Sequence, residues 1–130
     1  VIFTSDNGGV GGYDREGISK KGSGGVTDNA PLRSGKGSLY EGGTRVPFIA
    51  RWPGVIPAGS TSAALAGQLD LFATCAEILG VAPPANAAED SFSLLRELRG
   101  EPPAEHARPA LVYHSGEGRF SIQEGACPGS

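Results

Sequence analysis

Glycine is the residue type that most constrains what this chain can fold into. Between Gly8 and Gly43 the sequence holds 12 glycines in 36 residues and shows no sustained hydrophobic period. Because glycine favours neither helix nor strand, this stretch is predicted to be one long loop, and loops of this length in compact domains are usually functional or disordered. The loop and its exit carry four side chains that can reach a ligand: Arg33, Lys36, Tyr40 and Arg45.

The remaining composition leaves material for only a thin core. Of the 130 residues, 28 are Leu, Ile, Val or Phe, just above the roughly 20% below which chains are usually disordered. The length fits one domain, and a net charge of −3 argues against nucleic acid as a partner. No apolar run approaches the roughly 18 residues that a membrane span requires. Cys75 and Cys127 are too few for a disulfide framework and are expected to be free thiols.

The distribution of charge predicts where an anionic ligand would bind, and the start of the sequence indicates what kind of chain this is. Residues 1–55 hold 7 basic and 5 acidic side chains, whereas residues 56–130 hold 4 and 9, so an anionic ligand is favoured in the first part. The chain lacks methionine, and residue 1 already lies in an apolar run. We therefore expect an interior piece of a longer protein, in which the start of this chain cannot report on a signal peptide.

Two short apolar runs predict strands. Val1–Thr4 is a continuous β-branched run closed by turn residues, a pattern typical of a buried strand in a parallel sheet. A second run covers residues 45–53. Pro47 has no N–H for a ladder, so it should lie at the start of that strand or on an edge.

Two helices and a hairpin are predicted further along. Residues 70–80 favour a helix with Asp70 as N-cap and Gly80 just past its end. Its apolar positions recur at helical spacing and predict one buried stripe: Phe72, Cys75, Ala76 and Leu79. A shorter helix over residues 93–99 should be capped by Ser93 or Asp90. Residues 110–124 predict a β-hairpin with its turn at residues 116–118 and with Phe120 and Ile122 on one face.

Common phosphate and zinc motifs are not matched. Lys36 is followed by glycine rather than Ser or Thr, and position 30 is alanine, so the P-loop pattern fails. His106 and His114 lie eight positions apart with no further Cys or His between them, which does not favour a zinc site.

Three residues remain as a candidate site. Asp6 and Asn7 directly follow the first predicted strand, at the end where open α/β sheets bind ligands. A carboxylate beside an amide oxygen supplies two hard donors suited to Ca²⁺ or Mg²⁺, although Asp and Asn before glycine also simply form turns. Lys36 lies between two glycines, where backbone and ammonium can both approach a ligand, although a lone loop lysine is usually just solvated.

Four segments resemble the formylglycine-dependent sulfatases, arylsulfatase-like members of the alkaline-phosphatase superfamily. These segments are TSDNG (4–8), PLRSGKGSLYEGGTRVPFIARWPG (31–54), QLDLFATCAEILG (68–80) and FSLLRELRG (92–100). The resemblance runs from about residue 1 to about residue 125 and fits the carboxyl-terminal half of such a protein.

The resemblance implies a fold. It is α/β: the C-terminal part of an alkaline-phosphatase-like α/β sandwich with a mixed sheet, followed by the start of a small antiparallel C-terminal sheet. Residues 1–109 would belong to the catalytic domain, and residues 110–130 would form the first hairpin of a truncated C-terminal subdomain.

The resemblance also implies roles for single residues. Asp6 and Asn7 match the pair that completes a Ca²⁺ site, where Mg²⁺ is the alternative ion, and Lys36 matches the lysine that binds the substrate sulfate. The family's nucleophile is a formylglycine made within a C/S-x-P-x-R motif, and that motif is absent here; Cys127 does not fit it, because proline follows directly and no arginine comes after. The family's active-site Arg and His residues would lie upstream, so neither His106 nor His114 receives such a role.

The implied partners are a sulfated small molecule or glycan and the missing N-terminal half of the same protein, which would be periplasmic or secreted. The isolated chain is expected to be inactive, since it lacks the nucleophile. Two alternatives remain: a phosphoester or phosphonate hydrolase of the same superfamily, or a non-catalytic truncated binding module.

Overall fold

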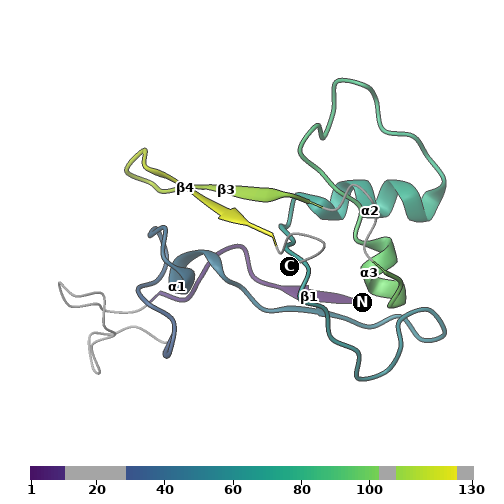
Figure 1. Ribbon diagram of the computed structural model, residues 1–130, viewed down its shortest axis with the longest axis horizontal. Coiled ribbons are helices and arrows are strands. Elements are labelled where there is room, and N and C mark those ends of the chain that lie inside the picture. The colour runs from purple at the N-terminus through teal and green to yellow at the C-terminus, as the bar shows by residue number, and fades with distance from the viewer. Residues whose placement is uncertain (11–28, 103–107, 126–130) are drawn as a thin grey trace. The chain divides into compact units, whose positions relative to one another are not determined.

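The computed structural model describes residues 1–10, 29–102 and 108–125 (Figure 1). Along the chain the elements are β1 (Ile2–Thr4), α1 (Glu41–Thr44), β2 (Phe48–Ala50), α2 (Asp70–Leu79), α3 (Leu95–Arg99), β3 (Ala110–His114) and β4 (Phe120–Glu124). The predicted α/β class is therefore confirmed. The one-turn helix α1 was not predicted, because it lies inside the glycine-rich stretch that predicted a loop.

The chain divides into two compact units. One contains Ala50–Leu111 together with Val1 and Gln123–Ser130, and the other contains Ile2–Ile49 together with Val112–Ile122. The domain division predicted at residue 109 stays a prediction.

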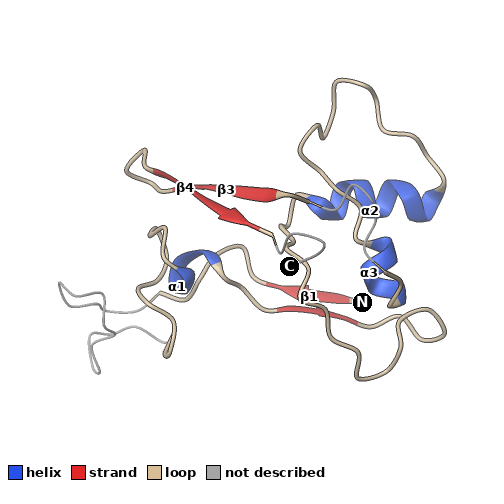
Figure 2. Cartoon of the chain, in the orientation of Figure 1, coloured by secondary structure: helices blue, strands red, loops and turns tan. Residues whose placement is uncertain are grey.

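Strands β1 and β2 pair antiparallel, and Figure 2 shows them side by side. At one end Val1 and Arg51 exchange two hydrogen bonds, each 2.8 Å long. At the other end the N–H of Gly8 donates to the carbonyl oxygen of Gly43 at 2.9 Å. Because residue numbers rise along one strand as they fall along its partner, the predicted parallel strand is wrong for the described chain. Pro47 directly precedes β2, as its missing N–H predicted.

The apolar side chains of this two-stranded sheet are not buried. Phe3 and Ile49 are each 62% exposed. The prediction of a buried strand is therefore wrong for the described residues. The physical reason is that two short strands cover neither face of a sheet, so that β-branched and aromatic residues stay in contact with water.

Helix α2 begins and ends close to the predicted residues. Leu69 occupies the N-cap position and Asp70 is the first helical residue, so the helix begins one position earlier than predicted. Gly80 ends the helix in the left-handed conformation, with φ 66°. The N–H groups of Gly80 and Val81 donate to the carbonyl oxygens of Glu77 and Ala76 at 3.1 and 3.0 Å. These are the two hydrogen bonds of a Schellman motif.

The buried side of α2 is polar, which corrects the predicted stripe. Asp70 and Thr74 are the buried residues of the helix, whereas Phe72, Cys75 and Leu79 are exposed and Ala76 is half-buried. The cause is a set of side-chain hydrogen bonds that tie the polar side to residues 91–94. Cys75 is a free thiol, and Cys127 lies outside the described residues.

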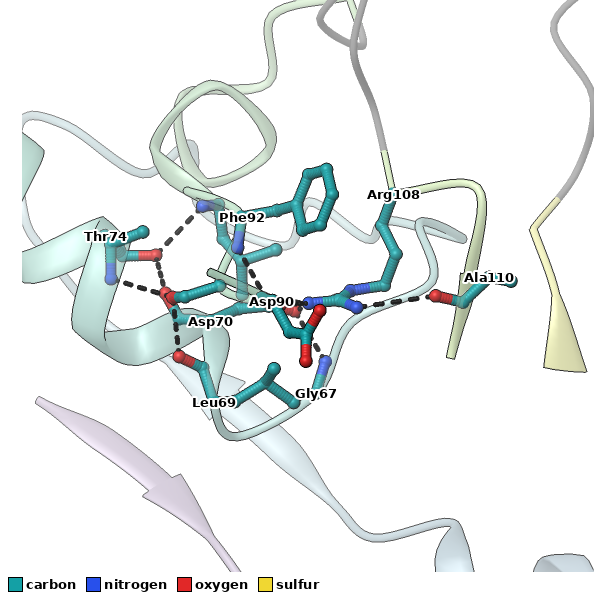
Figure 3. Close-up of polar contacts among 11 residues, drawn as sticks. Gly67, Leu69, Asp70, Thr74, Asp90, Phe92, Arg108 and Ala110 are labelled. Carbon is teal, nitrogen blue, oxygen red and sulfur yellow. Dashed lines mark hydrogen bonds and ion pairs between the residues drawn. The ribbon is translucent and has the colours of Figure 1, made fainter. Parts of the chain in front are cut away.

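A buried polar cluster holds this unit together (Figure 3). Asp70 has no solvent exposure, and its carboxylate accepts the N–H groups of Gly67 and Phe92 at 2.7 and 2.9 Å. The guanidinium of Arg108 pairs with the same carboxylate and also lies 4.6 Å above the ring of Phe92. Thr74 donates to the carbonyl oxygen of Asp70 at 2.6 Å and accepts from the N–H of Leu94 at 2.9 Å, so the backbone before α3 is anchored to α2.

Helix α3 and the apolar core lie next to this cluster. In the described residues the buried hydrophobic side chains are Leu94, Leu95 and Leu111, which agrees with the thin core expected from composition. The N-cap of α3 is Leu94, without a side-chain capping bond, so the predicted cap by Ser93 or Asp90 is wrong. Ser93 lies one position before the N-cap, and its hydroxyl oxygen accepts the N–H of Leu95 at 3.2 Å. Gly100 ends α3 with φ 72°.

Strands β3 and β4 form the predicted hairpin. The N–H of Ser115 donates to the carbonyl oxygen of Arg119 at 2.9 Å across the turn, and Gly118 has φ 77°. Phe120 and Ile122 are both exposed, as expected for residues that share a face. Among the described residues, no helix is long and apolar enough to cross a membrane.

Candidate functional site

The candidate site begins just after β1. Asp6 is exposed, and its carboxylate forms no hydrogen bond or ion pair with the rest of the described chain. The side-chain amide of Asn7 donates from Nδ2 to the carbonyl oxygen of Gly8 at 2.8 Å. That bond occupies the donor end of the amide and leaves Oδ1 as the acceptor end. The two residues therefore present oxygen atoms that other parts of the described chain do not use.

The loop that carries Lys36 is fixed to this same segment by its main chain. The N–H of Lys36 donates to the carbonyl oxygen of Gly9 at 3.1 Å, two residues beyond Asn7. Lys36 itself is exposed, and its ammonium has no hydrogen-bond or ion-pair partner among the residues that the structure describes. The structure thus brings the three predicted residues, Asp6, Asn7 and Lys36, onto adjoining loops of one unit.

Three backbone segments cross at very short range beneath these loops. A Cβ atom on Gly8 would lie 1.8 Å from the carbonyl oxygen of Gly42, and one on Gly42 would lie 2.1 Å from that of Ser34. A Cβ on Gly43 would lie 2.5 Å from the carbonyl oxygen of Gly35. No side chain fits at such distances, so these glycines are required for close approach rather than for a turn. The crossing fixes the loop after β1 against the loop that carries Lys36.

Sequence reasoning missed the role of the glycine pair in the middle of α1. Gly42 and Gly43 are buried in a helix of only four residues, and the N–H of Gly42 donates to the carbonyl oxygen of Arg33 at 2.8 Å. The signal available in the sequence was the doublet itself, because two adjacent glycines at a loop exit often mark a close backbone contact.

The other loop side chains singled out from the sequence already have partners. The guanidinium of Arg33 lies 3.8 Å above the ring of Tyr40, and Arg45 pairs with Glu41 at 3.6 Å. Among the described cations singled out in this loop and its exit, Lys36 is therefore the one without a partner. His114 packs its ring against Phe120 on the hairpin, with centroids 4.8 Å apart, and His106 lies outside the described residues.

The donor atoms present fit part of a site for a hard divalent cation. Asp6 and the Oδ1 atom of Asn7 supply oxygen, the donor that Ca²⁺ and Mg²⁺ prefer. The buried hydroxyl oxygens of Thr4, at the end of β1, and Ser38, in the loop that carries Lys36, have no hydrogen-bond partner within the described ranges. No group of three or more His, Cys, Asp and Glu residues in those ranges is arranged to hold a metal. Asp6 and Asn7 would thus be a minority of the roughly six to eight ligands that Ca²⁺ takes.

The stretch that contains this whole arrangement also matches a known protein family. A family model described as Sulfatase covers residues 1–81. The chain belongs to the sulfatase family. The family predicted from the sequence is therefore confirmed, and the matched stretch of this sulfatase chain includes Asp6, Asn7 and Lys36.

Individual relatives agree with the family. The sulfatase chain is 38% identical to the N-acetylgalactosamine-6-sulfatase of Canis lupus familiaris, over 96% of this chain and 22% of the relative. It is 42% identical to the N-acetylgalactosamine-6-O-sulfatase of Bacteroides thetaiotaomicron, over 78% of this chain and 20% of the relative. It is also 44% identical to arylsulfatase A of Homo sapiens, over 96% of this chain and 23% of the relative. The chain spans about a fifth of the length of these curated relatives.

Proposed function

We propose that the protein to which this chain belongs hydrolyses sulfate esters, that Asp6 and Asn7 help to hold a Ca²⁺ ion, with Mg²⁺ as the alternative, and that Lys36 binds the sulfate. The observation that carries the proposal is the backbone hydrogen bond from Lys36 to Gly9, which ties the residue that bears the ammonium to the segment directly after Asp6 and Asn7. Membership of the sulfatase family, matched over residues 1–81, supports the same reading.

Each residue of the chain has a definite part in this proposal. Lys36 is a compact positive charge that would bind a sulfate oxygen and offset the negative charge that develops as the ester S–O bond breaks. Asp6 and Asn7 would hold the cation, which would supply further positive charge next to the sulfate. The attack on sulfur would be made by a formylglycine, whose C/S-x-P-x-R motif does not occur in these 130 residues.

The proposed substrate class rests on the names of the relatives. Two of the three relatives are named for N-acetylgalactosamine-6-sulfate chemistry and the third is an arylsulfatase. We propose a sulfated amino sugar as the substrate to test first, with a generic aryl sulfate as a reporter of the chemical step. An aryl phosphate tests the phosphoester alternative.

The deciding experiment measures kcat/KM of the full-length protein on an aryl sulfate for wild type, Lys36→Ala and Lys36→Arg. If Lys36 binds sulfate, Lys36→Ala lowers kcat/KM by about 100-fold or more, equivalent to about 3 kcal/mol of transition-state stabilisation. Lys36→Arg should restore only part of it, because a planar guanidinium does not replace a compact ammonium. Arg119→Ala, which removes an exposed cation on the hairpin, is the matched control and should leave the rate unchanged.

Two outcomes would contradict the proposal. If Lys36→Ala keeps more than about a third of the wild-type kcat/KM, the role of Lys36 is wrong. If the wild-type protein cleaves an aryl phosphate far faster than an aryl sulfate, the phosphoester alternative replaces sulfate hydrolysis.

A further inference from the structure

One main-chain carbonyl, that of Gly9, collects the contacts between the two loops of the candidate site. It accepts the N–H of Lys36 at 3.1 Å and the side-chain Nδ2 of Asn29 at 3.0 Å. The same Nδ2 atom also donates to the carbonyl oxygen of Ser34 at 3.2 Å. The side-chain amide of Asn29 therefore joins the loop after β1 to the loop that carries Lys36. Its contact with the second loop is at Ser34, two residues before the lysine.

We propose that Asn29 is a positioning residue that holds Lys36 in place beside Asp6 and Asn7. The proposal rests on the function proposed above and adds a residue to it. Its Nδ2 atom donates to main-chain carbonyls of the chain itself, so Asn29 is assigned no contact with substrate. It would act through Lys36, by setting where the lysine leaves the backbone.

The chemistry of the bridge is specific to an amide. Each of the two N–H bonds of an –NH₂ group can serve one acceptor, so one Asn29 side chain serves the carbonyls of Gly9 and Ser34 together. Aspartate has the same shape but no donor, and would place negative oxygens against both carbonyls. Serine has one donor and could satisfy only one of them.

Backbone strain at Ser34 supplies a second, independent observation. Ser34 has φ 65°, in the left-handed region, where the Cβ of a non-glycine residue makes the conformation unfavourable. Such a conformation persists only when surrounding contacts hold it, and the carbonyl of Ser34 is held by Asn29. Without that bond Ser34 would relax toward negative φ, and the chain that follows it, including Lys36, would turn away from Gly9.

The first test measures the loop directly and does not depend on activity. Amide hydrogen exchange of Lys36 is compared by NMR in the full-length wild-type protein, Asn29→Ala and Asn29→Asp. We expect the Lys36 amide to exchange at least 10-fold faster in both variants, while the amide of Leu94 keeps its wild-type rate. Asn86→Asp alters an exposed amide elsewhere and is the matched control. Unchanged exchange at Lys36 in both variants would overturn the proposal.

A rescue experiment separates positioning from general damage. Glycine adopts positive φ without cost, so Ser34→Gly removes the strain that Asn29 holds in check. We expect Asn29→Ala combined with Ser34→Gly to recover part of the lost protection at Lys36. If Asn29→Ala does not fold, Asn29→Ser, which keeps one donor, takes its place and should give an intermediate exchange rate. No recovery of protection in the Ser34→Gly background would contradict the strain argument.

Measurements of kcat/KM distinguish failure of this inference from failure of the proposed function. We expect Asn29→Ala to lower kcat/KM on an aryl sulfate about 10-fold in the wild-type background and less than 2-fold in the Lys36→Ala background, because the residue acts through the lysine. The same 10-fold loss in both backgrounds would overturn the proposal about Asn29 alone. An inactive wild type, or a neutral Lys36→Ala, would overturn the proposed function, and the hydrogen-exchange result would still decide whether Asn29 holds the loop.

Discussion

Arg108 binds the carboxylate of Asp70, which lies 38 positions earlier in the chain, through two donors of its guanidinium. Nε donates to Oδ2 at 3.2 Å and Nη2 donates to Oδ1, so each carboxylate oxygen receives one arm of the fork. Both side chains are almost completely buried: the exposed fraction is 6% for Arg108 and zero for Asp70. This pair is therefore a structural element of the unit that contains α2.

We predict that breaking this pair from either side is strongly destabilising. Arg108→Ala leaves the Asp70 carboxylate buried without its counter-charge, and Asp70→Ala also leaves the N–H groups of Gly67 and Phe92 unpaired. A loss of about 3–5 kcal/mol in the free energy of unfolding is expected for each variant. Urea denaturation of the full-length protein followed by circular dichroism measures it.

The hairpin offers a matched control for that experiment. Arg119 pairs with Glu117 at 3.5 Å, but both side chains are about three-quarters exposed. Arg119→Ala should therefore change the free energy of unfolding by less than about 1 kcal/mol. Equal losses for Arg108→Ala and Arg119→Ala would show that burial of the Asp70 pair adds nothing.

The second prediction concerns the glycine crossing. Gly42→Ala places a methyl group 2.1 Å from a main-chain oxygen that cannot move without moving its loop, so we expect a loss of at least about 1–3 kcal/mol in unfolding free energy. Gly116→Ala is the control, because a Cβ there meets nothing within 4 Å. The comparison of thermal melting temperatures decides it, and a Gly42→Ala protein as stable as the control would refute the crossing as described.

The third prediction concerns metal binding by the full-length protein. Asp6→Asn keeps the shape of the side chain but removes its charge, so we expect the Kd for Ca²⁺, measured by isothermal calorimetry, to rise at least 10-fold. Glu124→Gln, which neutralises a carboxylate at the end of β4, should leave the Kd unchanged. Identical Ca²⁺ affinity in wild type and Asp6→Asn would remove Asp6 from the proposed ligand set.

The fourth prediction concerns residues 1–130 expressed alone. The chain lacks the nucleophile motif, so we expect no turnover of an aryl sulfate above a blank. Its β1–β2 sheet exposes apolar residues such as Phe3 and Ile49, and exposed strands invite association. Sedimentation should therefore show self-association and only a marginal thermal transition. Clear sulfatase turnover, or a sharply cooperative transition of a monomer, would contradict this expectation.

Local signals in the sequence located the elements well. The hairpin turn, the left-handed Gly80 and the position of Pro47 depend on the conformational limits of single residues, which do not change with tertiary context. The order of elements and the α/β class followed from them. The one-turn helix α1 was missed because four residues carry no periodic signal.

Which side of an element is buried was not predictable in the same way. The apolar stripe of α2 fits a helix packed on a hydrophobic core, yet the described chain buries Asp70 and Thr74 instead, because hydrogen bonds from residues 91–94 and Arg108 satisfy that side. Such bonds join residues far apart in sequence, and no local pattern encodes them. The orientation of β1 was missed for the same reason, since its partner strand lies more than 40 positions away.

The candidate site was found residue by residue, but its construction was not. Asp6, Asn7 and Lys36 stood out by type and by the segments that resemble sulfatases. The bridging amide of Asn29 and the close approach of Gly8, Gly42 and Ser34 were not foreseen, because each depends on where the loop returns in space.

The glycine crossing has a consequence for anyone who exchanges loops between homologous proteins. Since backbone touches backbone there, the spacing between Asp6 and Lys36 is inherited with the main chain and not with any one side chain. A graft that transfers residues 31–39 alone would place Lys36 on main-chain contacts of the recipient protein instead of its own. Residues 6–9 and 29–43 are therefore the smallest set of segments that should be transferred together. Recombination breakpoints within these segments should be selected against.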